Sequence, residues 1–232
     1  MTADEQAIIN RPPHFKAKII TGAVLAVVLP ILAAIVIGAL PIPYLDKVIY
    51  SRFIYWIEVL LLMFYAYKVE QQKLLIWKNI PLSVWKFLLA VLVLYLLSVA
   101  SAIVAYIPQR FGWHDSNVVF KKIVAILKNR YWLAIFVAFT AGVTEEFIFR
   151  GYLLTRLSLL FNNKYLPVII SSVLFAAMHY KYNSLREYIF VFLIGVLYGA
   201  YYQKYRNIKV VMAAHFLVDL ISLTVAHYYG VK

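Results

Sequence analysis

Long runs of apolar residues recur along the whole chain, and shorter segments between them carry most of the charged residues. An α-helix needs about 20 apolar residues to cross a hydrocarbon layer of ~30 Å. The clearest run, residues 19–40, carries no charge and is too long for the core of a signal peptide, so we expect a retained first span. The pattern predicts seven spans in all, at residues 19–40, 50–67, 84–107, 131–161, 165–180, 187–202 and 208–229.

A further segment, residues 117–128, places apolar residues at helical spacing with lysines between them. This pattern is typical of an amphipathic helix in the headgroup layer, although the segment could instead belong to an eighth crossing. Aromatic residues gather near the ends of the predicted spans, as in the interfacial belts of membrane proteins. The sequence therefore predicts an all-α, polytopic membrane helical bundle with about seven or eight transmembrane helices.

Composition supports this prediction, because 64% of the 232 residues are hydrophobic and only 14% are charged, which excludes an ordinary soluble domain. We expect a single integral membrane domain over residues 1–232, with a short polar N-terminus at 1–18 and a motif-bearing core at 131–229. The net charge of +13 is scattered over the loops, which favours contact with anionic lipid over nucleic acid. The absence of cysteine excludes disulfides, thiolate metal sites and a cysteine nucleophile.

Glu145, Glu146 and Arg150 lie close together inside the apolar run at 131–161. Charges within a membrane are costly and usually functional. Glu146 and Arg150 are four positions apart and can form an ion pair along one helix face. Glu145 points about 100° away from Glu146, so the two carboxylates cannot bind that arginine equally. We predict that one carboxylate is structural and that the other is available for chemistry.

Two later spans carry ionisable groups at the same four-residue spacing: His179 follows Phe175 in FAAMH, and Asp219 follows His215 in HFLVD. Polar groups on three spans are expected to meet one another or a water-filled cavity, which requires Glu145, His179 and His215 to reach a common depth. Such a cluster can activate water for amide hydrolysis, with a carboxylate as base and histidines as relay and oxyanion stabiliser. It would also suit a proton-coupled carrier, but the chain shows no paired broken helices or inverted repeat.

The motifs EEFIFR, FAAMH and HFLVD occur in this order. They resemble the EExxxR, FxxxH and HxxxN or HxxxD motifs of the CPBP (Abi) family, which comprises type II CAAX prenyl endopeptidases and related bacterial membrane proteins. The resemblance covers residues 131–229. It implies a CAAX-protease-like glutamic intramembrane peptidase.

The resemblance also implies a role for each motif residue. Glu145 would be the general base on the hydrolytic water, with His179 assisting, and His215 and Asp219 would form the oxyanion site. Glu146 and Arg150 would be supporting residues. Position 219 departs from the asparagine of the well-studied CAAX proteases, and an ionised aspartate has no proton to donate. Asp219 would therefore either orient or charge His215, or be kept protonated by burial.

Several alternatives stay open at this point. Glu145, His179 and His215 also form a plausible zinc set, but the chain lacks a compact HExxH pair and we expect no cofactor. Glu58, alone in the second span, is expected to pack between helices or to contact a loop lysine. A non-catalytic immunity or partner protein of the membrane is a further alternative to an enzyme.

The expected partners are the lipid bilayer and a membrane-tethered protein or peptide substrate that is cut near its C-terminus, with no nucleic acid. The resemblance implies prenylated CAAX proteins as substrates in eukaryotes, and bacteriocin-related peptides or sorted C-terminal tags in prokaryotes. The compact chain favours a multi-pass protein of a prokaryotic cytoplasmic membrane.

Overall fold

The computed structural model describes residues 13–113, 115 and 118–229, so most of the predicted polar N-terminus lies outside the described residues. The long helices are α2 (Pro13–Ala39), α3 (Tyr44–Tyr65), α4 (Val84–Ala105), α7 (Tyr131–Glu146), α10 (Leu185–Tyr205) and α11 (Ile208–Tyr229). The shorter elements are η1 (Ala66–Glu70), α5 (Ile107–Arg110), α6 (Val118–Leu127), η2 (Phe147–Leu154), α8 (Thr155–Leu160), α9 (Leu166–Ala177) and η3 (Tyr180–Tyr182).

Six helices in the described part of the chain are long and apolar enough to cross a membrane. One of them is the continuous helix formed by α7, η2 and α8. The fifth predicted span, at 165–180, is the exception: α9 has only 12 residues, rises about 18 Å and ends at Ala177. Helix α3 begins at Tyr44, six residues before its predicted start. The all-α membrane bundle is confirmed, with six long helices and the shorter α9.

Helix α6 decides between the two readings of the segment at 117–128. It has 10 residues and rises about 15 Å, which is too short for a crossing. Its Leu127 is buried, whereas Lys121 and Lys122 are exposed, and the helix packs against α11 and η3. The amphipathic surface helix is therefore confirmed, and an eighth crossing at this segment is wrong.

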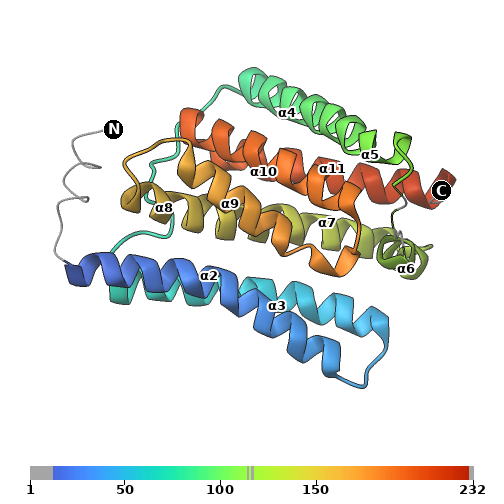
Figure 1. Cartoon of the computed structure of the whole chain (residues 1–232), viewed down its shortest axis with the longest axis horizontal. Coiled ribbons are helices and arrows are strands. Elements are labelled where there is room, and N and C mark those ends of the chain that lie inside the picture. Colours follow the sequence, from blue (N-terminus) through green and yellow to red (C-terminus); the bar gives the residue numbers. More distant parts are fainter. Residues whose placement is uncertain (1–12, 114, 116–117, 230–232) are drawn as a thin grey trace.

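The helix made of α7, η2 and α8 lies in the middle of the bundle. Figure 1 shows α2 and α3 side by side along one edge and α4 along the opposite edge, with α7 to α11 between them. Helix α11 packs along α7, and α9 packs along α10. Gly142 lets α7 and α11 approach closely, because a Cβ at this position would lie 2.7 Å from the backbone nitrogen of Phe216. This close approach brings the Glu145 and His215 motifs next to each other.

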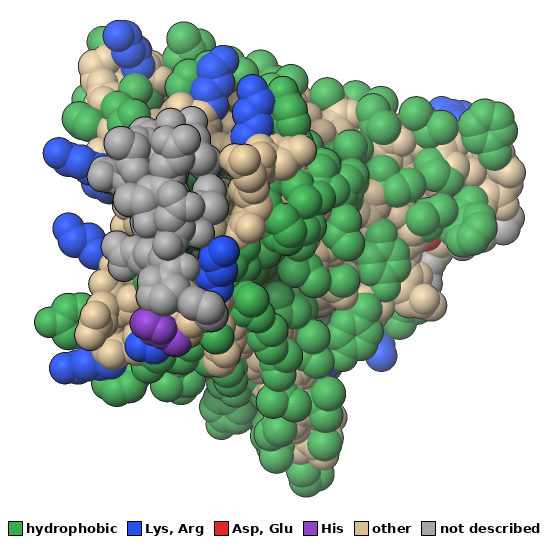
Figure 2. Space-filling model, turned by 60° about the vertical axis from the view of Figure 1, so that its left-hand side comes forward, with side chains coloured by type: hydrophobic (Ala, Val, Ile, Leu, Met, Phe, Trp, Pro, Cys, Tyr) green, Lys and Arg blue, Asp and Glu red, His purple; other side chains and the backbone are tan. Residues whose placement is uncertain are grey.

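The outer surface is apolar along the membrane-spanning helices. Figure 2 shows hydrophobic side chains over much of one face and Lys and Arg gathered towards one end. On α2, α3 and α4, the side chains of Leu32, Leu60 and Leu92 are each more than half exposed. In a bilayer these side chains contact lipid, so their exposure costs nothing there.

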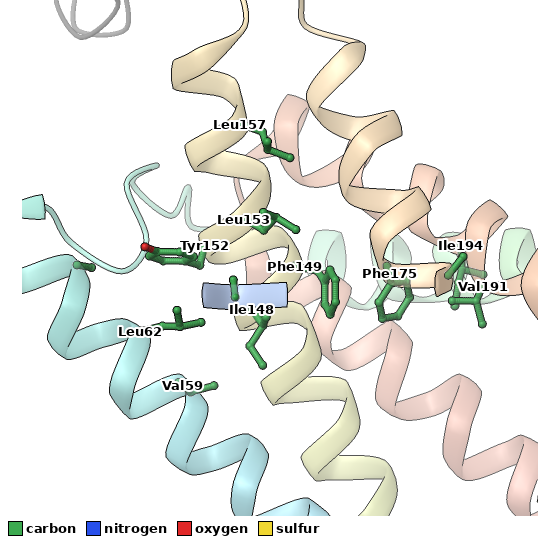
Figure 3. Packing of buried hydrophobic residues seen from close by; sticks show 13 residues of the cluster. Val59, Leu62, Ile148, Phe149, Tyr152, Leu153, Leu157, Phe175, Val191 and Ile194 are labelled. Atoms are coloured by element: carbon green, nitrogen blue, oxygen red, sulfur yellow. The ribbon is translucent and has the colours of Figure 1, made fainter. Parts of the chain in front are cut away.

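The core around the central helix is built from aromatic and branched side chains. Figure 3 shows Phe149 of η2 facing Phe175 of α9, with Val191 of α10 beyond them. The ring centroids of the two phenylalanines lie 4.9 Å apart. On the other side of η2, Leu62 of α3 packs beside Ile148. The aromatic pair holds α9 against the central helix just below His179.

A buried ion pair fixes the opposite end of the central helix. Arg156 donates from Nε and Nη2 to Oε2 of Glu70, over 3.1 and 2.8 Å, and the hydroxyl of Tyr152 donates to Oε1 over 2.6 Å. Arg156 also donates to the backbone oxygens of Lys73 and Leu74. This cluster pins the loop after η1 to α8, and since its charges are fully bonded we assign it a structural role.

The start of α10 is held by two side chains. Ser184 accepts a hydrogen bond from the backbone N–H of Glu187, as an N-cap does. The carboxylate of Asp115 accepts from the backbone N–H groups of Leu185 and Arg186, over 2.6 and 3.1 Å. Burial raises the pKa of Asp115, but these backbone hydrogen bonds outweigh burial and leave its pKa lowered.

Candidate active site

Glu146 is the buried centre of the motif residues. Its Oε1 accepts a hydrogen bond from Nη1 of Arg150 over 2.9 Å and another from Nδ1 of His215 over 2.8 Å. The side chains of Glu146 and Arg150 are 0% and 1% exposed. The predicted ion pair along the helix is therefore confirmed, and Glu146 is the carboxylate that makes buried contacts with other motif residues.

Arg150 also contacts aromatic rings on two other helices. Its guanidinium lies 4.3 Å from the ring centroid of Phe175 on α9 and 5.8 Å from that of Tyr198 on α10. The hydroxyl of Tyr198 shares a hydrogen bond of 2.9 Å with that of Ser98 on α4. The π-helical η2, which contains Arg150, follows Glu146 directly, and such segments frequently mark functional sites.

Glu145 points to a different place. Its side chain lines a cavity and is about one-tenth exposed, whereas that of Glu146 is fully enclosed. Its ion-pair partner within the described residues is Arg52 of α3, with Nη1 3.9 Å from Oε1. This separation exceeds that of a direct charge-assisted hydrogen bond, so both groups still present polar atoms to the cavity.

His179 follows the end of α9 and lines the same cavity. Its Nδ1 lies 3.0 Å from the backbone oxygen of Phe175. A carbonyl oxygen can only accept, so Nδ1 carries the proton and Nε2 of the neutral ring has a free lone pair. The ring stacks on Tyr182 at 5.8 Å between centroids. Burial, and less strongly the charge of Glu187, raises the pKa of Tyr182, so its phenol stays protonated and can donate.

His215 and Asp219 lie on α11 and complete the set. Nε2 of His215 is 3.7 Å from Oδ2 of Asp219, and the Asp219 side chain is one-third exposed. Because Nδ1 of His215 donates to Glu146, both ring nitrogens of this histidine face carboxylates. Asp219 is therefore placed to orient or charge His215, which is one of the two roles expected for it.

The cavity that these residues share has a volume of about 830 Å³. It is lined by the C-terminal half of α2, the first turns of α3, the apolar face of α6, and parts of α9, α10 and α11. Its walls are largely apolar, with residues such as Ile37, Val48, Phe120 and Val225, and Glu145, His179, His215 and Asp219 line it as well. The expected meeting of the three motifs in one cavity is thus observed.

Among the described residues, no three His, Asp or Glu side chains are grouped as metal ligands. In the alternative zinc set of Glu145, His179 and His215, the histidine at position 215 does not fit, since its Nδ1 is bonded to Glu146 and its Nε2 faces Asp219.

Comparison with known proteins gives a finding for the second half of the chain. Residues 127–221 match the protein-family model described as type II CAAX prenyl endopeptidase Rce1-like. The chain carries an Rce1-like domain. No curated protein and no solved structure matches the chain. The resemblance inferred from the three motifs is therefore confirmed.

The Rce1-like domain extends from α6 into α11 and contains all six motif residues. Its family is one of proteases that act on protein substrates, and the six long apolar helices make the chain an integral, multi-pass membrane protein. Helices α2, α3 and α4 lie outside the matched residues, yet all three form part of the cavity wall.

The motifs did not point to several residues of the cavity. Arg52 and Tyr55 of α3 and Glu187 of α10 line it beside the Rce1-like motif residues. The sequence could have indicated Arg52, which lies two residues inside the predicted span at 50–67, because an arginine in a span usually faces the bundle interior. Glu187 had no comparable signal, since a charge at the end of a predicted span is ordinary.

Glu58 differs from its expected surroundings. It is 2% exposed, and neither carboxylate oxygen has a hydrogen-bond partner among the described residues. It packs between helices, as predicted, but the predicted contact with a loop lysine is wrong. The charge of Glu145 acts on it electrostatically, so two carboxyl groups lie within range of each other here.

Proposed function

We propose that the protein is an intramembrane endopeptidase that hydrolyses a peptide bond near the C-terminus of a membrane-tethered protein or peptide, using water activated by Glu145. One observation carries this proposal: of the two adjacent glutamates, Glu146 is fully buried and bonded through Oε1 to Arg150 and His215, while Glu145 opens into the cavity beside His179. A carboxylate that is left available in such a cavity can act as a general base.

The chemical steps use the residues of the cavity. A carboxylate oxygen of Glu145 takes a proton from a water molecule as the water oxygen attacks the scissile carbonyl carbon, and the carbonyl π electrons move onto its oxygen. Glu145 then passes the proton to the leaving nitrogen as the carbon–nitrogen bond breaks. His179, with a lone pair on Nε2, holds the water or shares its proton.

His215 and Asp219 are placed to act as an electrostatic pair at the edge of the reaction. Glu146 fixes the ring of His215 through Nδ1, and Asp219 sits beside Nε2. Arg150 and Glu146 thus hold the position of the ring without reaching the substrate, because both are fully buried. We assign them a supporting role.

The cavity suits a substrate that stays in the membrane. Its volume lies within the usual range for binding pockets, and the apolar side chains on its walls suit a hydrophobic tether or apolar side chains of the substrate. We propose that the host is a prokaryote, that the site is the cytoplasmic membrane, and that the reaction needs no metal. To test whether the reaction needs a metal, the protein is dialysed against EDTA and shown by elemental analysis to be free of bound zinc. We expect this protein to keep its full cleavage activity.

The proposed activity is tested by comparing protein C-termini in host membranes that contain the wild type, Glu145→Gln or Asp46→Asn at equal abundance. Mass spectrometry is expected to find shortened C-termini with the wild type and Asp46→Asn, and none with Glu145→Gln. Asp46 is the matched control, because it undergoes the same acid-to-amide change in the first turn of α3. Identical C-termini in all three strains would reject the protease, and a remaining transport or immunity defect would favour a carrier or a partner protein.

A further inference from the structure

The proposed reaction produces a negative charge on the former carbonyl oxygen, and an active site must offer hydrogen-bond donors to that oxygen. The sequence directs attention to His215 and Asp219 for this task. In the structure, Nδ1 of His215 donates to Glu146 and Nε2 lies 3.7 Å from the Asp219 carboxylate. An ionised Asp219 has no proton to donate and would repel the oxyanion. This pair therefore offers the oxyanion at most the Nε2–H of a charged His215, which lies beside the repelling carboxylate of Asp219.

The cavity wall contains four cationic side chains, at positions 47, 52, 181 and 186. Two of them hold the end of α2: Lys47 donates to the backbone oxygen of Gly38 and Lys181 to that of Ala34, each over 2.8 Å. Arg186 donates to the hydroxyl of Tyr106 over 2.6 Å, with its guanidinium 4.7 Å from that ring centroid. These three cations have structural tasks at the rim of the cavity.

Arg52 is the fourth cation, and its surroundings differ. It extends from α3 towards Glu145, with Nη1 3.9 Å from Oε1, and its side chain is 18% exposed. Its other contacts in the described part of the chain are a long hydrogen bond from Nε to Oγ of Ser51, at 3.4 Å, and the ring of Tyr55, whose centroid lies 5.1 Å from the guanidinium carbon. Neither Nη1 nor Nη2 donates a hydrogen bond to a described residue, and the charge of Arg52 also acts on Asp219.

We propose that Arg52 binds the oxyanion of the hydrolysis reaction, and so takes the place of the side-chain amide that is absent at position 219. The proposal rests on the proposed protease function and adds a catalytic residue from outside the Rce1-like domain. The oxyanion and the hydroxyl derived from water are bonded to the same carbon. Neighbouring groups must therefore bind them, and Arg52 and Glu145 are neighbours of opposite charge on the cavity wall.

The chemistry of a guanidinium also suits the binding of an oxyanion. A guanidinium keeps its charge at every relevant pH and offers its Nη donors in a fixed plane. In a cavity shielded from bulk water its interaction with a developing charge is stronger than at a surface. Removal of one such donor typically slows the chemical step by about 10²- to 10³-fold.

The test measures kcat and KM for detergent-purified protein on a fluorescence-quenched peptide with an S-farnesyl cysteine three residues before a free C-terminus, from pH 5 to 9. Four variants are compared with the wild type: Arg52→Gln, Arg52→Lys, Asp219→Asn and the double variant Arg52→Gln/Asp219→Asn. Lys209→Gln is the matched control, since it removes an exposed cation of α11 that does not line the cavity. Thermal unfolding of each variant reports on folding.

We expect Arg52→Gln to lower kcat by about 10²- to 10³-fold at every pH, with KM changed much less. Arg52→Lys should keep part of the rate, and Lys209→Gln should stay within about threefold of the wild type. In the double variant, the amide introduced at position 219 supplies a donor and removes a repelling charge. The loss caused by Arg52→Gln should therefore be at least about tenfold smaller in that background.

Three results would overturn the assignment. If the rate of Arg52→Gln recovered at alkaline pH, the only task of Arg52 would be to keep Glu145 ionised. Other ionisable groups that line the cavity with Glu145 are Asp219, His179, His215 and Glu187. An equal loss in both position-219 backgrounds would mean that the two positions do not share a task. An unchanged rate would leave the phenol of Tyr182 as the donor.

Glu145→Gln separates these results from a failure of the proposed function. If the wild type cleaves and Glu145→Gln does not, the protease stands whatever Arg52 does. If neither the peptide nor any host protein is cleaved by the wild type, both proposals fall.

Discussion

Replacement of Arg150 by methionine tests the division of labour between the two glutamates. In the wild type Glu146 is fully buried, and its charge is balanced by Arg150 at 2.9 Å and by the His215 ring at 2.8 Å. Arg150→Met keeps much of the side-chain length but leaves the Glu146 carboxylate without its permanent counter-charge. The contact of the guanidinium with the Phe175 ring is also lost.

The magnitude follows from this geometry. Removal of one partner of a buried ion pair costs about 3–5 kcal/mol, because an uncompensated charge remains in a medium that solvates it poorly. At about 1.4 kcal/mol for each factor of ten, the unfolding equilibrium constant rises by roughly two to three and a half orders of magnitude. In Arg150→Met/Glu146→Gln the uncompensated charge is gone, so we expect about half or more of the lost stability to return.

The assay is reversible unfolding in mixed micelles, followed by tryptophan fluorescence and by circular dichroism. Arg110→Met is the control, because Arg110 is exposed at the end of α5 and its replacement should change stability by less than about 0.5 kcal/mol. A loss under about 1 kcal/mol for Arg150→Met, or no recovery in the double variant, would refute the reasoning. It would show that the Glu146 charge is stabilised by groups other than Arg150.

Three further predictions concern stability. Glu58→Met should raise the free energy of unfolding by about 1–3 kcal/mol, because it removes a buried carboxyl group without hydrogen bonds; a less stable variant would contradict this. Gly142→Ala should lower stability by about 1–3 kcal/mol and reduce cleavage, since its Cβ would press on the backbone of Phe216 and part α7 from α11; a variant with wild-type stability and rate would refute this. Asp115→Asn should be less stable than the wild type at neutral pH. The lowered pKa of Asp115 means that its contribution is present above its unfolded value of 3.8 and is lost as the pH falls through the folded value, so the difference measured by thermal unfolding should shrink below about pH 4. A difference that persists at low pH would show that the hydrogen bonds to the start of α10 do not depend on the charge.

The sequence determined the fold class and the identity of the motif residues. Apolar runs longer than a signal core have few solutions in a bilayer other than spanning helices, because every backbone group must find a partner within the segment. The four-residue spacing of Glu146 and Arg150 predicted their ion pair, since the two positions share one face of any α-helix. The angular offset of Glu145 predicted that it would be the available carboxylate, and its place on the cavity wall agrees.

Only the tertiary structure decided which residues from other helices face that carboxylate. The spacing of Glu145 within α7 contains no information on α3, so the approach of Arg52 to 3.9 Å depends on how two helices pack. The link from Glu146 to His215 is likewise set by the close contact of α7 and α11 at Gly142. Local spacing fixes the directions of side chains along one helix, whereas distances between helices follow from the packing of whole surfaces. For that reason the sequence alone identified the candidate reacting groups, whereas their partners on other helices were determined by the packing of the helices.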